Sequence, residues 1–232
     1  MHHGRMAYVL LHSPLVGPST WYPVADRLRA AGATVVVPVL TPALAGDPPY
    51  WPRMVRVVRT ALAGVPRDEP VAVVAHSNAG LYVPVVCAEL DHPVAASVFV
   101  DAAMPARSGD TPVEPPHMLH MVRGMAVDGV VPRWTDWWDA ADVATLFPDD
   151  TTRQRVTAEQ PCLPLAYFES SVPVPDGWAD HPVAYLQLSP GYEAEAAEAA
   201  DRAWRVESLP GDHLHQLVDP DAVTARLLQL AR

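Results

Sequence analysis

The hydrophobic positions of this chain fall into short unbroken runs, separated by longer stretches with helical periodicity. Strands buried on both faces of a parallel sheet have this continuous apolar character, whereas half-exposed strands alternate apolar and polar residues. The intervening helices supply the crossovers that parallel strands need. The pattern therefore predicts a doubly wound α/β fold with strands at Ala7–Leu11, Ala33–Val39, Val71–Ala75, Ala95–Val100, Val183–Leu188 and Trp204–Leu209.

The segments between these runs have the spacing and end signals of amphipathic helices. The segment Tyr22–Ala31 places its apolar residues on one face and stops at Gly32. Pro52 suits the first turn of a helix over Arg53–Ala63, because the missing N–H of proline is not needed there. Two further helices are expected at Glu193–Arg202 and Asp219–Leu230.

The stretch that begins at Ala102 breaks this rhythm. It is rich in proline, methionine and tryptophan, and it is too long for a loop inside a compact domain. We predict an inserted helical cap over residues 102–181 and a core formed by residues 1–101 and 182–232. The apolar side chains of the cap form either its own small core or part of a ligand cavity, and Trp137 and Met104 are candidates for the cavity.

Composition narrows the possible functions of the 232-residue chain. The formal net charge is −11 and all 16 basic residues are arginine, which disfavours a nucleic-acid partner and leaves a small-molecule substrate as the expected one. The absence of lysine excludes a lysine Schiff base and a Walker lysine. Cys87 and Cys162 have no metal-ligand spacing, so no metal is expected. No leader sequence or membrane-spanning run is visible, which favours the cytoplasm.

The strongest chemical signal is the sequence VAVVAHSNAG at residues 71–80, where a buried strand runs into small-His-Ser-Asn-small and then an apolar helix. A serine on such a sharp strand-to-helix turn needs small residues two positions to either side. Ala75 and Ala79 provide them, although the common form of the motif has glycine at both places. The pattern predicts that Ser77 is a nucleophile, at a helix N-terminus that favours developing negative charge.

A serine nucleophile needs a base, and His213 is the best candidate. It follows the last predicted strand on a Gly-Asp turn and precedes the final helix, so it belongs at the carboxyl edge of the sheet. His215, two residues further on, is the alternative.

Together, the His12-Ser13-Pro14 loop after the first strand, the Ser77 turn, the inserted cap and the late His213 resemble the α/β-hydrolase superfamily over essentially the whole chain. The short first loop and small cap are most similar to its esterase and hydroxynitrile-lyase branch. The resemblance implies Ser77 as nucleophile, His213 as base, and an oxyanion hole built from the backbone of Asn78 and of the loop after His12. It also implies that no cofactor is used.

The acid of the expected triad is the first departure from the superfamily pattern. The usual place, just after the penultimate strand, reads Leu188-Ser189-Pro190-Gly191-Tyr192-Glu193 and holds no aspartate. Asp101, which ends an earlier strand, is our preferred acid because some members of the superfamily place it there. Glu193 is the alternative, and a site without any acid is the third possibility.

The second departure is Pro14, which has no N–H where the superfamily loop commonly donates one to the oxyanion. Losing one such donor costs about 3 kcal/mol of transition-state stabilisation. The Ser13 hydroxyl offers compensation, and in the lyase branch a hydroxyl residue at this place contacts substrate. The alternative is a register one residue further on, with the N–H of Leu15 donating instead.

Two enzyme functions and one binding function fit these features. The first is a serine hydrolase that cleaves an ester or thioester of a small apolar acyl group. The second is a lyase, eliminase or cyclase that uses Ser77 and His213 as acid and base without an acyl-enzyme. A binding protein that has lost its catalytic activity fits less well, because Ser77 and His213 are both present. A Rossmann dehydrogenase is set aside because no GxGxxG follows the first strand.

Overall fold

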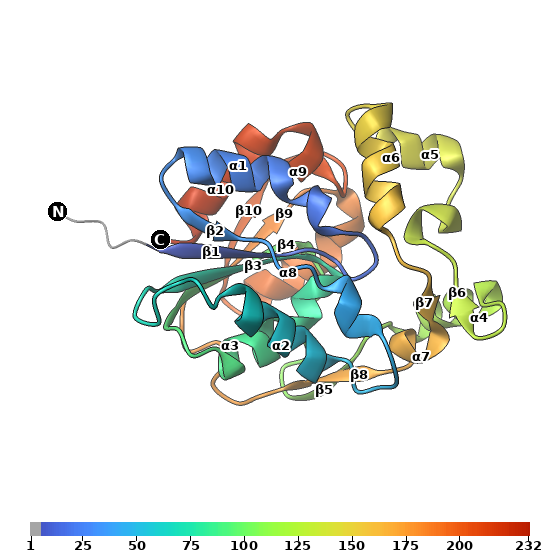
Figure 1. Ribbon diagram of the computed structural model, residues 1–232, viewed down its shortest axis with the longest axis horizontal. Coiled ribbons are helices and arrows are strands. Elements are labelled where there is room, and N and C mark those ends of the chain that lie inside the picture. The colour runs from blue at the N-terminus through green and yellow to red at the C-terminus, as the bar shows by residue number, and fades with distance from the viewer. Residues whose placement is uncertain (1–5) are drawn as a thin grey trace.

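A single parallel sheet forms the centre of the computed structural model, which describes residues 6–232 (Figure 1). Its strand order is β10-β9-β4-β3-β1-β2, and every neighbouring pair is parallel. The predicted fold class is confirmed. The strands are β1 (Ala7–Leu11), β2 (Thr34–Val36), β3 (Val71–Ser77), β4 (Val94–Ala102), β9 (Val183–Gln187) and β10 (Arg205–Ser208).

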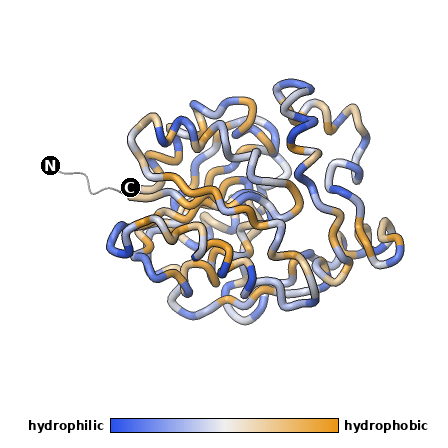
Figure 2. The backbone as a smooth tube through the Cα atoms, in the orientation of Figure 1, coloured by the Kyte–Doolittle hydropathy of each residue, from blue (hydrophilic) through white to orange (hydrophobic). Residues whose placement is uncertain are grey.

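Helices cover both faces of the sheet and create two separate cores. One face packs against α1 (Tyr22–Ala30) and α10 (Pro220–Leu230), with the short α9 (His215–Val218) beside them. The other packs against α2 (Trp51–Ala61), α3 (Val83–Glu89) and α8 (Glu193–Asp201). The central strands are buried from both sides, which explains their continuous apolar runs, and Figure 2 shows the hydrophobic residues concentrated along them.

The second strand is shorter than predicted, because it covers Thr34–Val36 where the pattern indicated Ala33–Val39. It lies at the edge of the sheet, and Pro38 lacks the N–H that would extend the ladder with β1. The predicted helices all form, with ends that differ by one or two residues. Within residues 6–232, no helix is both long enough and apolar enough to cross a bilayer.

The segment between β4 and β9 forms a lobe beyond the carboxyl ends of the strands (Figure 1). Two small antiparallel pairs tie it together, β5 with β8 and β6 with β7. Its elements are β5 (Gly109–Pro112), α4 (Pro116–Met125), β6 (Val130–Val131), the 3-10 turn η4 (Trp134–Trp137), α5 (Ala140–Thr145), α6 (Asp150–Glu159), β7 (Leu163–Pro164), α7 (Leu165–Phe168) and β8 (Ser171–Val174).

This lobe lies in the segment assigned to the cap from sequence, but the boundaries drawn at residues 101/102 and 181/182 stay predictions. Residues 1–5 of the predicted core lie outside the described part. The lobe also contacts the first loop of the core: Glu159 at the end of α6 accepts a hydrogen bond from the backbone N–H of Ser19 at 3.0 Å. The site described next lies between these two parts.

Candidate active site

Ser77 sits on a strained turn at the carboxyl end of β3. Its backbone has φ 58° and ψ −135°, a conformation that residues other than glycine rarely adopt. The 3-10 turn η3 (Asn78–Tyr82) follows at once and leads into α3. Gly80 permits the close packing here, since a Cβ at that position would collide with the carbonyl oxygen of Ala103. The packing of η3 against β4 therefore holds Ser77 in the strained conformation.

Asp101 and His213 meet at the carboxyl ends of the strands. Nδ1 of His213 lies 2.9 Å from Oδ2 of Asp101, which is fully buried at the end of β4. The other carboxylate oxygen accepts hydrogen bonds from the backbone N–H groups of Leu188 and Ser189 at 2.8 and 3.0 Å. The Ser189 hydroxyl donates to Oδ2. Asp101 thus accepts hydrogen bonds from four donors in two segments of the chain.

These contacts keep Asp101 ionised. Burial alone would raise the pKa of its carboxyl group, but the hydrogen bonds and charge of His213, with the Ser189 donors, outweigh burial and lower the pKa. A carboxylate at Nδ1 fixes the tautomer in which Nδ1 carries the proton, which leaves Nε2 of His213 as the acceptor.

The sequence alternatives for the acid and the base lie elsewhere. Glu193 begins α8, is exposed, and makes no hydrogen bond to His213 within residues 6–232. His215 begins α9, and its ring packs over Gly211, where a Cβ would collide with it. The structure thus brings Asp101 and His213 together, not Glu193 or His215.

His76, which precedes the serine in the motif, packs behind the candidate base. Its ring centroid lies 4.5 Å from that of His213, and its Nε2–H donates to the His213 carbonyl oxygen at 2.8 Å. Burial, with a smaller contribution from the nearby His213, lowers the pKa of His76 to about 3. A neutral His76 therefore positions both the ring and the backbone of His213.

The loop after β1 forms a tight turn from Ser13 to Val16, closed by a 3.1 Å bond from Val16 N–H to the Ser13 carbonyl oxygen. Pro14 occupies the second position, which its fixed φ favours. The N–H of Leu15 donates to Oγ of Ser13 at 3.3 Å, so it is already engaged. The hydroxyl hydrogen of Ser13 is not used in that bond.

His12 supports this loop from the inside. Its Nε2 accepts the N–H of Leu40 at 3.0 Å, so its Nδ1 carries the proton and donates to the Ser13 carbonyl oxygen at 2.8 Å. Burial lowers the pKa of His12 to about 4. His12 is therefore a neutral scaffold of the loop whose ring nitrogens are both engaged.

The side chain of Asn78 is held by the cap. Its Oδ1 accepts the Tyr167 hydroxyl at 2.5 Å, and its Nδ2 donates to the carbonyl oxygen of Val113 at 3.3 Å. Tyr82 donates in turn to Tyr167. These contacts fix the orientation of the Asn78 side chain, and its backbone N–H, at the start of η3, is a candidate donor to a ligand at Ser77.

The cavity beside Ser77 has a volume of about 20 Å³, which is room for about one water molecule. Trp134 contributes to it from the cap, and its ring lies 6.0 Å from that of His213. Trp137 and Met104 do not line it: Trp137 donates to the carbonyl oxygen of Pro132, and Met104 packs against the core. The lining residues are Ser13, Leu15, Val16, His76, Ser77, Trp134, His213 and Leu214.

The nucleophile candidate has an unexpected neighbour. Oγ of Ser77 lies 3.5 Å from the hydroxyl oxygen of Tyr192, whereas no hydrogen bond joins Ser77 to His213 in the described chain. Tyr192, Ser189 and His76 all contact the site, and sequence reasoning assigned no role to any of them. A signal existed only for His76, which lies inside the serine motif.

A second serine and histidine also contact each other. Oγ of Ser97, on β4, lies 2.7 Å from Nε2 of His181, which precedes β9. Ser97 is fully buried in the middle of a strand and has no positive φ. It lacks the strained turn that presents Ser77. The Ser97 pair is therefore a packing contact between β4 and the segment before β9.

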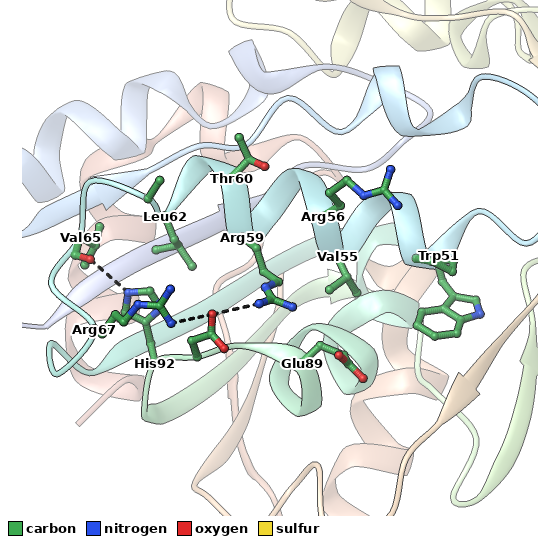
Figure 3. Close-up of a pocket in the computed structure, with 13 residues that line it drawn as sticks. Trp51, Val55, Arg56, Arg59, Thr60, Leu62, Val65, Arg67, Glu89 and His92 are labelled. Carbon is green, nitrogen blue, oxygen red and sulfur yellow. Dashed lines mark hydrogen bonds and ion pairs between the residues drawn. The ribbon is translucent and has the colours of Figure 1, made fainter.

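A wider groove, of about 650 Å³, lies beside α2 and the residues that follow α3 (Figure 3). Arg59 and Arg67 both pair with Asp91 there, at 3.0 and 2.9 Å. Its lining residues include neither Ser77 nor His213. The groove is therefore separate from the candidate active site.

The strained serine turn, the parallel sheet and the histidine after its last strand together define the α/β-hydrolase fold, and solved structures agree. The chain is similar to a variant of tomato methylketone synthase I (17% identity, TM-score 0.76, 98% of each chain covered). It is also similar to an extracellular α/β-hydrolase from a Paenibacillus species (15% identity, TM-score 0.75, 98% of this chain and 99% of that one).

A third similar structure is polyneuridine aldehyde esterase, with 14% identity, a TM-score of 0.73, and 98% of this chain and 100% of that chain covered. No protein-family profile matches the sequence, and no curated protein matches it either. At these identities the likeness establishes the fold, and the chemistry must be argued from the residues.

Proposed function

We propose that the protein is a serine-dependent carboxylic ester hydrolase, acting on an ester or thioester with a small apolar acyl group. The observation that carries this proposal is the strained Ser77 turn beside the buried Asp101–His213 pair. The names of several similar structures, among them an esterase and a methylesterase, support ester chemistry.

In the proposed reaction, His213 takes the proton of Ser77 as the serine oxygen attacks the carbonyl carbon. Asp101 holds the His213 tautomer and stabilises the imidazolium that forms. The backbone N–H of Asn78, at the start of η3, faces the growing negative charge together with the hydroxyl of Ser13. His213 then returns the proton to the leaving alcohol or thiol, and water hydrolyses the acyl-enzyme.

The apolar walls of the cavity favour a small hydrocarbon acyl group. Leu15, Val16, Trp134 and Leu214 supply those walls. Because the cavity holds only about one water, an acyl group needs more room beside Ser77, and we expect Trp134, the cap residue that lines the cavity, to move when the substrate binds.

Hydrolysis of p-nitrophenyl acetate, butyrate and octanoate tests this proposal. We expect turnover of the two short esters, and we expect Ser77→Ala to lower kcat/KM by at least about 10³-fold. Ser97→Ala is the matched control, because it removes the other histidine-bonded serine and should retain the activity. Equal rates for wild type and Ser77→Ala would contradict the assignment of the nucleophile.

A second candidate is a lyase, eliminase or cyclase in which Ser77 and His213 act as acid and base without an acyl-enzyme. Two observations favour it: Ser77 lies nearest to Tyr192 rather than hydrogen-bonded to His213, and Pro14 has no N–H for an oxyanion. Acid quenching during turnover separates the two candidates. A hydrolase leaves an acyl group on Ser77, and the second mechanism leaves none.

A further inference from the structure

Tyr192 contacts two of the residues that the proposed reaction uses, Ser77 and His213. It ends the 3-10 turn η5 (Pro190–Tyr192), directly after β9 and before α8. Its hydroxyl oxygen lies 3.5 Å from Oγ of Ser77. Its ring lies parallel to that of His213, with 4.8 Å between the centroids and 4° between the planes. The turn after β9 therefore presents a phenol to the nucleophile.

The phenol of Tyr192 is held in its protonated form. Burial raises its pKa, and the nearby carboxylates of Asp101, Glu195 and Glu114 raise it further, against a smaller opposite effect of the Ser77 hydrogen bond. A neutral phenol has an O–H to donate, and its position beside Ser77 directs that donor toward the reacting atoms.

Other donors around Ser77 are scarce. Pro14 has no N–H, the N–H of Leu15 is bonded to Oγ of Ser13, and the Asn78 side chain is bonded to Tyr167 and Val113. The proposed reaction places a negative charge on the substrate oxygen, and this charge needs preorganised donors. Ser13, the backbone N–H of Asn78 and the Tyr192 hydroxyl are three donors that lie close to Ser77.

We propose that Tyr192 is a further catalytic residue, whose phenol O–H donates a hydrogen bond to the substrate oxygen that becomes negatively charged at Ser77. The role replaces the donor that Pro14 lacks, and it rests on the proposed ester hydrolysis. Stacking on His213 holds the Tyr192 ring in place, so the donor needs little reorganisation when the charge forms.

The bonding changes in this step are limited. The Ser77 Oγ–H proton passes to Nε2 of His213, the Oγ–C bond forms, and the π pair of the carbonyl moves onto the substrate oxygen. Tyr192 donates a hydrogen bond to that oxygen and keeps its proton. When the carbonyl re-forms, the leaving group departs with the proton from His213 and the Tyr192 hydroxyl is unchanged.

Tyr192→Phe tests the role, because it removes the hydroxyl and keeps a ring that can stack on His213. We expect kcat for p-nitrophenyl butyrate to fall by about 100-fold with KM and the melting temperature nearly unchanged. Tyr22→Phe on the exposed surface is the matched control. A kcat within threefold of wild type would overturn the proposal while leaving the hydrolase assignment intact.

A fluorinated tyrosine incorporated at position 192 keeps the shape of the side chain and makes its phenol more acidic. The raised pKa of the wild-type phenol places its alkaline limb at very high pH, and we expect fluorination to move this limb of the kcat profile to lower pH, since the ionised phenol no longer donates. If Tyr192 has a purely structural role, the alkaline limb does not move. That result would overturn the proposal even if Tyr192→Phe did not fold. If the wild type hydrolyses no ester and a fluorophosphonate does not label it, ester hydrolysis fails, and the Tyr192 role fails with it.

Discussion

At the scale of single residues, the position of Asp101, the proposed acid, is the feature that most shapes the site. The segment after β9, where the superfamily usually carries the acid, here supplies donors in its place: the N–H groups of Leu188 and Ser189 and the Ser189 hydroxyl. The carboxylate comes from Asp101 on the neighbouring strand β4, and β4 pairs with β9. A carboxylate on β4 thus makes the contact with His213, and the segment after β9 supplies hydrogen-bond donors to that carboxylate.

Asp101→Asn should lower kcat by about 10⁴-fold. The amide oxygen would accept the backbone N–H groups of Leu188 and Ser189, which turns the NH₂ group toward Nδ1 of His213. That contact stabilises the tautomer with the proton on Nε2, which cannot accept the proton of Ser77. Steady-state kinetics on a short ester measure the effect, and Glu193→Gln, at the exposed start of α8, should stay within about twofold. The reverse pattern would assign the acid to Glu193.

Sequence reasoning reached Ser77, His213 and Asp101 because each follows a strand whose apolar run is visible. The supporting contacts of Ser189 and Tyr192 were not predictable, because they depend on which strands are neighbours and on how the turn after β9 bends. Trp137 and Met104 show the same limit, since their apolar character marks burial and does not say which cavity they line.

At the scale of elements, the tight turn from β3 into η3 is the feature that presents Ser77, the proposed nucleophile. The backbone of Gly80 packs directly on the end of β4, against Ala102 and the carbonyl oxygen of Ala103. The Ala103 N–H also bonds to the carbonyl oxygen of Ser77 at 3.0 Å. The Ser77 conformation is therefore coupled to the same strand end that carries Asp101.

Gly80→Ala should destabilise the fold by about 1–3 kcal/mol, because the new methyl group forces η3 away from backbone that cannot yield. Ester turnover should fall as well, since the shift moves Ser77. Urea unfolding monitored by tryptophan fluorescence measures the stability. Gly64→Ala is the matched control, with open space around its Cβ; equal loss in both variants would refute the packing argument.

The core elements were largely predictable and the cap elements were not. Buried strands leave continuous apolar runs and amphipathic helices leave a periodic pattern. Only β2 is clearly shorter than predicted, because it ends before Pro38. The cap is built from short helices and two-residue strands such as Val130–Val131, which are too brief for periodicity to reveal. Its contacts with the core, such as Tyr167 with Asn78, join distant segments and leave no local pattern.

At the scale of the whole molecule, the burial of two neutral histidines makes the free energy of unfolding depend on pH. His12 and His76 have pKa values of about 4 and about 3 in the fold, against about 6.5 in the unfolded chain. Below pH 6.5 the unfolded chain binds protons that the folded protein excludes, so stability is lost as pH falls. Glu114 opposes this, because burial raises its pKa to about 7. Burial raises the pKa of Glu195 as well, whereas the lowered pKa values of Asp101 and His181 add to the loss of stability at low pH, so we expect the histidines to dominate.

We therefore expect the free energy of unfolding to fall between pH 6.5 and 4.5, with His12 alone contributing a loss of about 2 kcal/mol. His12→Gln should be less stable at pH 7.5 but should show a shallower pH dependence, because one excluded proton is gone. Urea titrations at several pH values measure both slopes. Parallel slopes for wild type and variant would contradict a neutral buried His12.

If this α/β-hydrolase fold presents Ser77 as a covalent nucleophile, an active-site phosphonylating reagent must modify that residue. Intact mass spectrometry after incubation with a fluorophosphonate tests it most directly, with peptide mapping to locate the adduct. We expect one phosphonyl group per chain, located on Ser77, no adduct in Ser77→Ala, and slowed labelling in Asp101→Asn. An unmodified wild-type protein, or an adduct that persists in Ser77→Ala, would contradict it.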